Sequence, residues 1–249
     1  MKMKNHSAAL FAVLFLFLSV LSDTPALAQE KGAVREGFSA EALQGQKIVL
    51  VRPSVWVGEQ SMAGVPEPNA DWTAQSRELL VAELGRRQAQ FSNVIIAEPE
   101  LVGPEAKLFA DYRSLFSTVA RSVMVYQFFL GNRLPTRKKG AFDWTLGDGT
   151  SRLGELTGAR YALFVTTRDE YGSTGRKIFQ LLAAGIAGVG VQSGVHQGFA
   201  GLVDLETGYL VWLNADGQMG GDVRTEDGMQ KRVRQLLEDF PGLAEEPAH

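Results

Sequence analysis

Residues 199–214, with the sequence FAGLVDLETGYLVWLN, decide the fold. Two apolar runs rich in strand-forming residues flank a short polar turn that ends at Gly208. Glycine adopts positive φ without steric cost, which tight hairpin turns need. We therefore predict that the two runs pair as an antiparallel hairpin, in which Asp204 and Gly208 have structural roles at the turn.

Apolar runs and amphipathic periodicities predict the other elements. The expected strands lie at 47–51 with a continuation at 54–57, 94–96, 161–167, 199–205 and 209–214. The expected helices lie at 71–90, 105–130, 151–157 and 225–240. Helices and strands alternate, and this order is typical of layered α/β proteins. We predict an α/β (α+β) single-domain sandwich over 47–240, with helices packed on a mixed sheet and a C-terminal antiparallel hairpin followed by a helix.

The composition is that of a globular protein. The chain has 249 residues, of which 45% are hydrophobic and 21% charged, and its net charge is −3. A disordered chain would combine low hydrophobicity with high net charge. A polyanion-binding domain would carry clustered Lys and Arg on a basic background. Both classes are disfavoured, and we expect no nucleic-acid partner.

The first 28 residues have the pattern of a secretory signal peptide, cleaved after Ala28. Lys2 and Lys4 precede an apolar run from residue 8 to residue 21, and small residues lead up to Ala28. The apolar run is shorter than the about 20 residues that a spanning helix needs, so an uncleaved anchor is the weaker alternative. We expect a periplasmic protein, with full secretion as the other alternative.

The segments that flank the predicted domain lack periodicity. Residues 29–46 are expected to be a flexible lead-in and residues 241–249 a flexible tail. The chain contains no cysteine, so no disulfide framework can hold it. Its stability must come from packing.

The residues that could carry chemistry do not form a recognisable catalytic motif. His196 has Ser193 nearby, but no orienting acid is evident for it, and no G-x-S-x-G elbow occurs. Residues 168–177 are expected to be a polar turn with solvated charges. We expect no catalytic residue, metal site or cofactor. A hydrolase that uses the loop 168–176 is an alternative, because α/β sheets place binding loops after their strands.

The segment 178–191 is almost wholly apolar and rich in Gly and Ala. It is too short to span a bilayer alone. One interpretation is a helix packed on the sheet, and the other is a surface that meets a partner or the membrane interface. The interaction surface expected on this basis comprises Arg168, Asp169, Arg176, Ile178, Leu182 and Ile186.

Two stretches resemble known bacterial envelope proteins. Residues 158–165, GARYALFV, and 201–212, GLVDLETGYLVW, resemble a pattern of the TolB amino-terminal domain and of the α/β domain of the CsgG-like family, the curli secretion channel. The resemblance implies a periplasm-facing module that assembles with other envelope components, and it offers no catalytic residues to carry over to this chain. The chain lacks the lipidation cysteine usual in the curli-channel family.

Together these features indicate a non-enzymatic periplasmic module that acts through protein contacts in envelope assembly or maintenance. The expected partners are envelope proteins, including further copies of this chain. A membrane-associated or ligand-carrying protein that uses residues 178–191 is the first alternative, with peripheral membrane contact. The hydrolase is the second.

Overall fold

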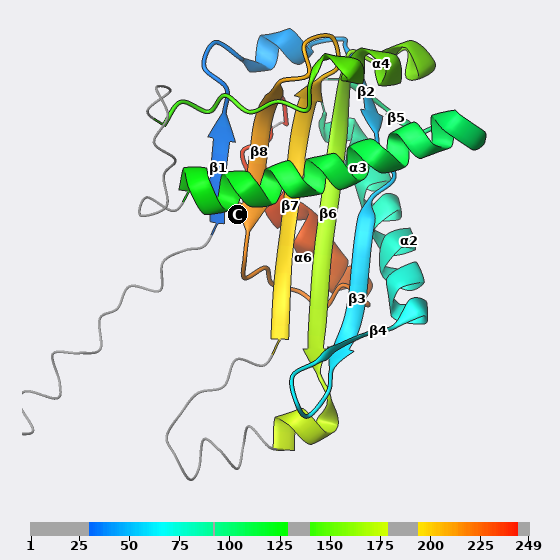
Figure 1. The fold of residues 1–249 in the computed structure, drawn as a ribbon, viewed down its shortest axis with the longest axis vertical. Helices are drawn as coiled ribbons and strands as arrows, with labels where there is room; N and C mark the ends of the chain where they lie inside the picture. The colour runs from blue at the N-terminus through cyan, green and yellow to red at the C-terminus, as the bar shows by residue number, and fades with distance from the viewer. Residues whose placement is uncertain (1–29, 92, 129–139, 179–193, 244–249) are drawn as a thin grey trace, which may run out of the picture.

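The computed structural model describes residues 30–91, 93–128, 140–178 and 194–243, which form a three-layer α/β sandwich (Figure 1). This confirms the predicted fold class. The described residues form an eight-stranded mixed sheet with the order β1-β8-β7-β6-β2-β5, in which β3 pairs with β6 and β4. The strands are β1 (Glu30–Val34), β2 (Lys47–Leu50), β3 (Ser54–Gln60), β4 (Pro66–Pro68), β5 (Val94–Ala97), β6 (Tyr161–Gly172), β7 (Gly194–Asp204) and β8 (Leu210–Asp216).

Helices cover both faces of the sheet. The main helices are α2 (Ala70–Arg86), α3 (Gly103–Val123), α4 (Ser151–Thr157) and α6 (Glu226–Leu236), and α3 continues into a π-helical turn over Met124–Phe128. The helices α2 and α6 pack on one face, and α3 and α4 on the other. The sheet therefore has a separate hydrophobic core on each side.

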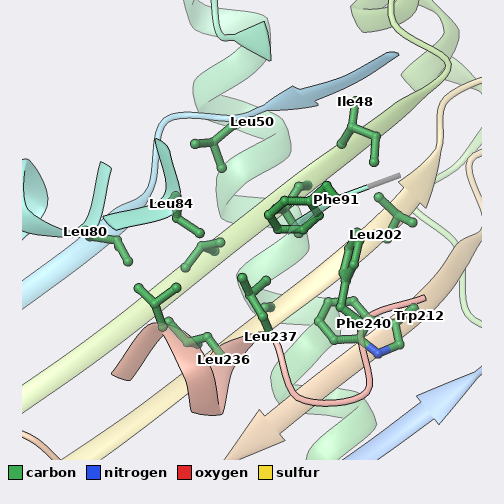
Figure 2. Packing of buried hydrophobic residues seen from close by; sticks show 14 of the residues in the cluster. Ile48, Leu50, Leu80, Leu84, Phe91, Leu202, Trp212, Leu236, Leu237 and Phe240 are labelled. Carbon is green, nitrogen blue, oxygen red and sulfur yellow. The ribbon is translucent and has the colours of Figure 1, made fainter. Parts of the chain in front are cut away.

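The core under α2 and α6 is built from aliphatic residues around a group of aromatic rings. Figure 2 shows Leu80 and Leu84 of α2 facing the sheet, with Phe240 beside Trp212 of β8. The rings of Trp212 and Phe240 meet edge to face at 5.0 Å between centroids, a geometry that adds to the gain from area burial. This contact ties the segment after α6 to the sheet.

Strand β6 organises the sheet, because three strands pair with it. It pairs antiparallel with β7 on one side, and parallel with β2 and then β3 on the other. Pro53 lies between β2 and β3, and a proline cannot donate to a ladder, which explains why the first ladder ends there. The predicted interruption between residues 47–51 and 54–57 is confirmed.

Strand β6 is also longer than predicted. The sequence favoured a strand over 161–167 followed by a polar turn, but the strand continues to Gly172. Charged residues rarely occupy a buried strand unless they are paired. Here Asp169 pairs with Arg232 of α6, and Glu170 accepts hydrogen bonds from Gln60 of β3 and from Arg168 of its own strand. The spacing of the two acids in the sequence does not show these partners.

The expected flexible lead-in at 29–46 is partly wrong. Residues 30–34 form β1, which pairs antiparallel with β8 from Glu30↔Asp216 to Val34↔Trp212. The edge of β8 offers unpaired backbone groups that a neighbouring segment can satisfy. A strand held by backbone pairing at an edge needs no hydrophobic alternation, so residues 30–34 carry no pattern that would predict it.

Three helix boundaries also differ from the prediction. Helix α2 begins after Asn69, whose side chain accepts a hydrogen bond from the Trp72 backbone N–H at 2.9 Å, and not at Asp71. Helix α6 has the expected cap at Thr225, but it ends at Leu236 and not at residue 240. Helix α3 ends at Val123, and the π-helical turn follows it.

The hairpin between β7 and β8 has the predicted antiparallel pairing. Gly208 adopts φ of 73°, in the left-handed region, and Asp204 Oδ1 accepts a hydrogen bond from the Glu206 backbone N–H at 2.9 Å. A Cβ atom at Gly208 would collide with the backbone carbonyl of Gly147. Both the backbone angle and the close approach therefore require glycine.

We predict that Gly208→Val destabilises the fold by more than about 2 kcal/mol, because left-handed strain costs about 1–2 kcal/mol and the collision adds to it. Urea denaturation measures the effect. The control is Gly37→Val, at a glycine with φ of 80° and open space around it, which isolates the strain. An equal loss of unfolding free energy in the two variants would contradict the role of the Gly147 contact.

Candidate functional site

A buried charge cluster joins the lower half of β6 to β7 and α6. Arg232 and Asp169 are both fully buried and form a two-pronged ion pair, with Nη2–Oδ1 at 2.7 Å and Nη1–Oδ2 at 2.8 Å. The Thr167 hydroxyl donates to Oδ2 of the same carboxylate at 2.7 Å, and His196 Nδ1 lies 2.8 Å from Oδ1. Each carboxylate oxygen therefore has two hydrogen-bonding partners.

Secondary structure explains this convergence. Thr167 and Asp169 are two residues apart on β6 and therefore project from the same face. His196 is the residue opposite Asp169 in the β6–β7 ladder. Arg232 lies on the buried stripe of α6 with Met229 and Val233. Strand alternation, register and helical periodicity bring together groups that are distant in sequence.

The surroundings keep Asp169 ionised. Burial alone would raise the pKa of the carboxyl, but hydrogen bonds from His196 and Arg232 and the charge of Arg232 outweigh it and lower the pKa below its ordinary value. The carboxylate must accept from His196, so Nδ1 carries the proton. Asp169 is thus a fixed anion whose acceptor positions are filled.

The charged and polar groups beside this cluster also have their partners within the chain. The Arg224 guanidinium lies between the rings of Tyr171 and Trp72, at 3.9 and 4.4 Å from their centroids. Arg224 also makes two hydrogen bonds to Asp222, at 2.8 and 2.7 Å, which hold the pKa of that carboxyl at about 2. Burial raises the pKa of Tyr171, whose hydroxyl accepts from the Val223 backbone N–H. These charges fix the segment before α6 onto the sheet.

The opposite face of the same strands is arranged differently. Helix α3 crosses the sheet near its middle, and no described helix lies in front of the lower parts of β3, β6 and β7 (Figure 1). We call this surface the open face; it is formed by Trp56, Arg168, Val195 and Gln197. Each of these side chains is partly exposed. The open face is the part of the sheet left accessible by the described helices.

A row of polar contacts crosses the open face from β3 to β6. The Arg168 guanidinium stacks on the Trp56 ring at 4.1 Å and donates to Glu170 Oε1 at 2.8 Å. Gln60 Nε2 donates to the other oxygen of Glu170 at 2.7 Å. Glu170 and Gln60 are almost fully buried by these contacts. The row holds Arg168 in place.

A groove of about 380 Å³ lies where the open face meets the end of α3. Its walls come from the last turn of α3, the π-helical turn and strands β6 and β7. The lining residues are Arg121, Met124, Val125, Arg168, Gln197 and Phe199. Within the described parts of the chain, this hollow combines apolar and cationic side chains.

The structure separates the residues expected to form one interaction surface. Arg168 lies on the open face, but Asp169 is fully buried on the other face, so its assignment to a surface is wrong. Ile178 is 56% exposed. The backbone N–H of Arg176 donates to the Ser173 hydroxyl in the segment after β6. Leu182 and Ile186, with most of the segment 178–191, lie outside the described residues.

Two features of the cluster were missed by reasoning from sequence. His196 has an acidic partner after all, since Asp169 binds it. Arg232 was not singled out, although a charged residue on the apolar stripe of α6 is a signal for a buried ion pair. The loop proposed for a hydrolase, 168–176, is largely wrong as a loop, because residues 168–172 belong to β6.

Neither a metal-binding cluster nor a membrane-spanning helix occurs in the described ranges. There, no three His, Asp or Glu side chains gather in a way that could hold a metal ion. Among the helices of these ranges, none is both long and apolar enough to cross a membrane.

Comparisons with known proteins give distant likenesses. No protein-family profile matches the chain, and no curated protein does. Among solved structures, the chain is similar to a PelC dodecamer from Paraburkholderia phytofirmans, with 12% identity, a TM-score of 0.36, and coverage of 87% of this chain and 98% of that one. Lipoprotein GNA1162 from Neisseria meningitidis gives 14% identity, a TM-score of 0.31, and coverage of 78% and 99%.

These values are too low for the function of either protein to be transferred. The resemblance to the TolB amino-terminal and CsgG-like domains stays a prediction.

We predict that Arg232→Met destabilises the protein by about 3–5 kcal/mol, because it leaves the buried Asp169 carboxylate without its cation. The double variant Asp169→Asn/Arg232→Met should lose less than the sum of the two single variants. Urea denaturation at pH 7 measures both. Additive losses would contradict the coupling of the two side chains.

The same pair predicts a pH dependence. The folded-state pKa of Asp169 lies below its unfolded value of about 3.9, so its stabilising contribution is present above that pH and is lost as the pH falls further. Between pH 5 and pH 2, Asp169→Asn should therefore lose less stability than the wild type. Parallel stability curves for the two proteins would contradict the assignment.

Proposed function

We propose that this chain is an exported, non-enzymatic module of the bacterial cell envelope that acts by binding other proteins during envelope assembly or maintenance. The observation that carries the proposal is the open face. No described helix covers the lower parts of β3, β6 and β7 on this face (Figure 1), and the side chains of the open face are partly exposed next to a groove. Accessible surface of this mixed apolar and polar kind suits a protein interface.

On the other face, the buried Asp169 is not available as a catalytic base. A general base must be free to accept a proton. Both oxygens of Asp169 accept two hydrogen bonds each, from Arg232, Thr167 and His196, so this carboxylate is not free to act as that base. An ion pair with Arg232 stabilises the anion and makes Asp169 a poor base. The cluster is suited to holding α6 and β7 together.

The proposed location rests on the amino-terminal sequence. Its basic start, apolar run and small residues before position 29 form a signal-peptide pattern. An exported chain without cysteine needs no oxidative folding step. The proposed site of action is therefore the periplasm.

Export has a direct test. A fusion of residues 1–60 to alkaline phosphatase, which is active only outside the cytoplasm, should be active in cells. Leu14→Arg should abolish that activity, because a charge disrupts the apolar run, whereas Leu14→Ile should preserve it. Mass spectrometry of the purified full-length protein should give Gln29 as its first residue. An inactive wild-type fusion would contradict export.

The binding surface can be tested in cells with a photo-reactive benzoylphenylalanine. We expect the probe at Gln197, on the open face, to yield covalent adducts with another protein. The matched control places the probe at Val81, which is 46% exposed on α2 on the opposite side of the sheet. Adducts with the mass of a dimer would identify a second copy as the partner. Equal yields from the two sites, or none from Gln197, would contradict the proposal.

A further inference from the structure

The groove beside the open face has an apolar floor and wall. Phe199 of β7 forms the floor, and Met124 and Val125 form the wall. Val125 is 41% exposed, although Val123, two residues before it, is buried. A hollow with these side chains can accept an apolar side chain and remove it from water.

The backbone beside the groove is unusual. Helix α3 is regular to Val123 and then widens into the π-helical turn that carries Met124 and Val125. Single π-helical turns within α-helices occur frequently at functional sites. In this chain the turn forms one wall of the groove.

The charge at the groove is positive. Arg168 is neutralised by Glu170 and held by Trp56. Arg121 is exposed in the last turn of α3, and it makes no ion pair or hydrogen bond with the described side chains. Its guanidinium is therefore available to a carboxylate, which it can bind with two parallel hydrogen bonds.

We infer that the groove recognises a protein segment in which apolar side chains alternate with carboxylates. The apolar side chain enters between Val125 and Phe199, and the carboxylate next to it binds Arg121. This inference rests on the proposed function, since it names the chemistry of the partner at the open face. A shallow groove and an exposed charge predict weak, salt-sensitive binding.

The methionines of the mature chain provide a test with internal controls. Met62, Met124, Met219 and Met229 would be labelled with ¹³C at their methyl groups and followed by NMR. Met124 lines the groove, Met62 is exposed on another loop, and Met219 and Met229 are buried in the core on the other face. The probe is the peptide acetyl-Leu-Glu-Leu-Glu-Leu-amide, and its control is the same peptide with Gln in place of Glu.

Of the four methyl signals, we expect the Glu peptide to shift only that of Met124. The Gln peptide should leave all four in place. Arg121→Glu should weaken binding of the Glu peptide by at least about tenfold, equivalent to 1.4 kcal/mol. Arg121→Lys should retain much of this binding. The matched control is Arg234→Glu, at an exposed arginine in the last turn of α6. Thermal melting would verify that each variant is folded.

The inference is overturned if the two peptides shift Met124 equally, if neither shifts it, or if Arg121→Glu binds the Glu peptide like the wild type. Failure here differs from failure of the proposed function. Adducts from Gln197 together with an unresponsive Met124 would mean that the open face binds a partner, but not through an acidic anchor. Absence of adducts from Gln197 would contradict the function itself.

Discussion

The ion pair between Asp169 and Arg232 is the interaction on which the lower half of the sandwich depends. It joins the lower half of β6 to α6 with two hydrogen bonds, and His196 adds β7 to the same carboxylate. Taking two charges out of water costs free energy, and only good geometry with further hydrogen bonds offsets that cost. Here Thr167 supplies such a bond. Removing one partner would leave a buried charge, so the helix and both strands are held in one arrangement.

The length of β6 follows from that pair and shapes the rest of the sheet. A strand that ended at residue 167 would lie largely under α3, with little of the sheet beyond the helix. Because Asp169 and Glu170 have partners, the strand continues to Gly172 and β3 pairs with its full lower half. The two faces of this extension then differ. One is closed by α2 and α6, and the other is the open face.

The contrast between the two faces guides the functional proposal. On the α6 face, Asp169, Asp222 and Arg224 are all bound by other groups of the chain. On the open face, Arg168 is positioned by its neighbours, and in the groove beside it Arg121 of α3 has no partner among the described residues. Charged side chains that are paired inside a fold stabilise it, whereas accessible charged side chains make binding to a partner specific. The second arrangement is the one expected of a binding module.

The sequence by itself determined the elements whose causes are local. Two apolar runs predicted the hairpin of β7 and β8, and side-chain chemistry predicted its glycine turn and the Thr225 cap of α6. These signals act within a few residues, so they can be found without knowing the fold.

Only the tertiary structure decided the rest. The extension of β6, the pairing of β1 and the burial of Asp169 depend on contacts between distant parts of the chain, such as the 63 residues that separate Asp169 from Arg232. A charged residue has the same local pattern whether it is solvated or paired with a buried partner. The groove likewise exists only because the last turn of α3 and the π-helical turn after it lie beside side chains of β6 and β7. Local periodicity carries no information about which helices and strands contact one another. Those contacts create both the buried cluster and the open face.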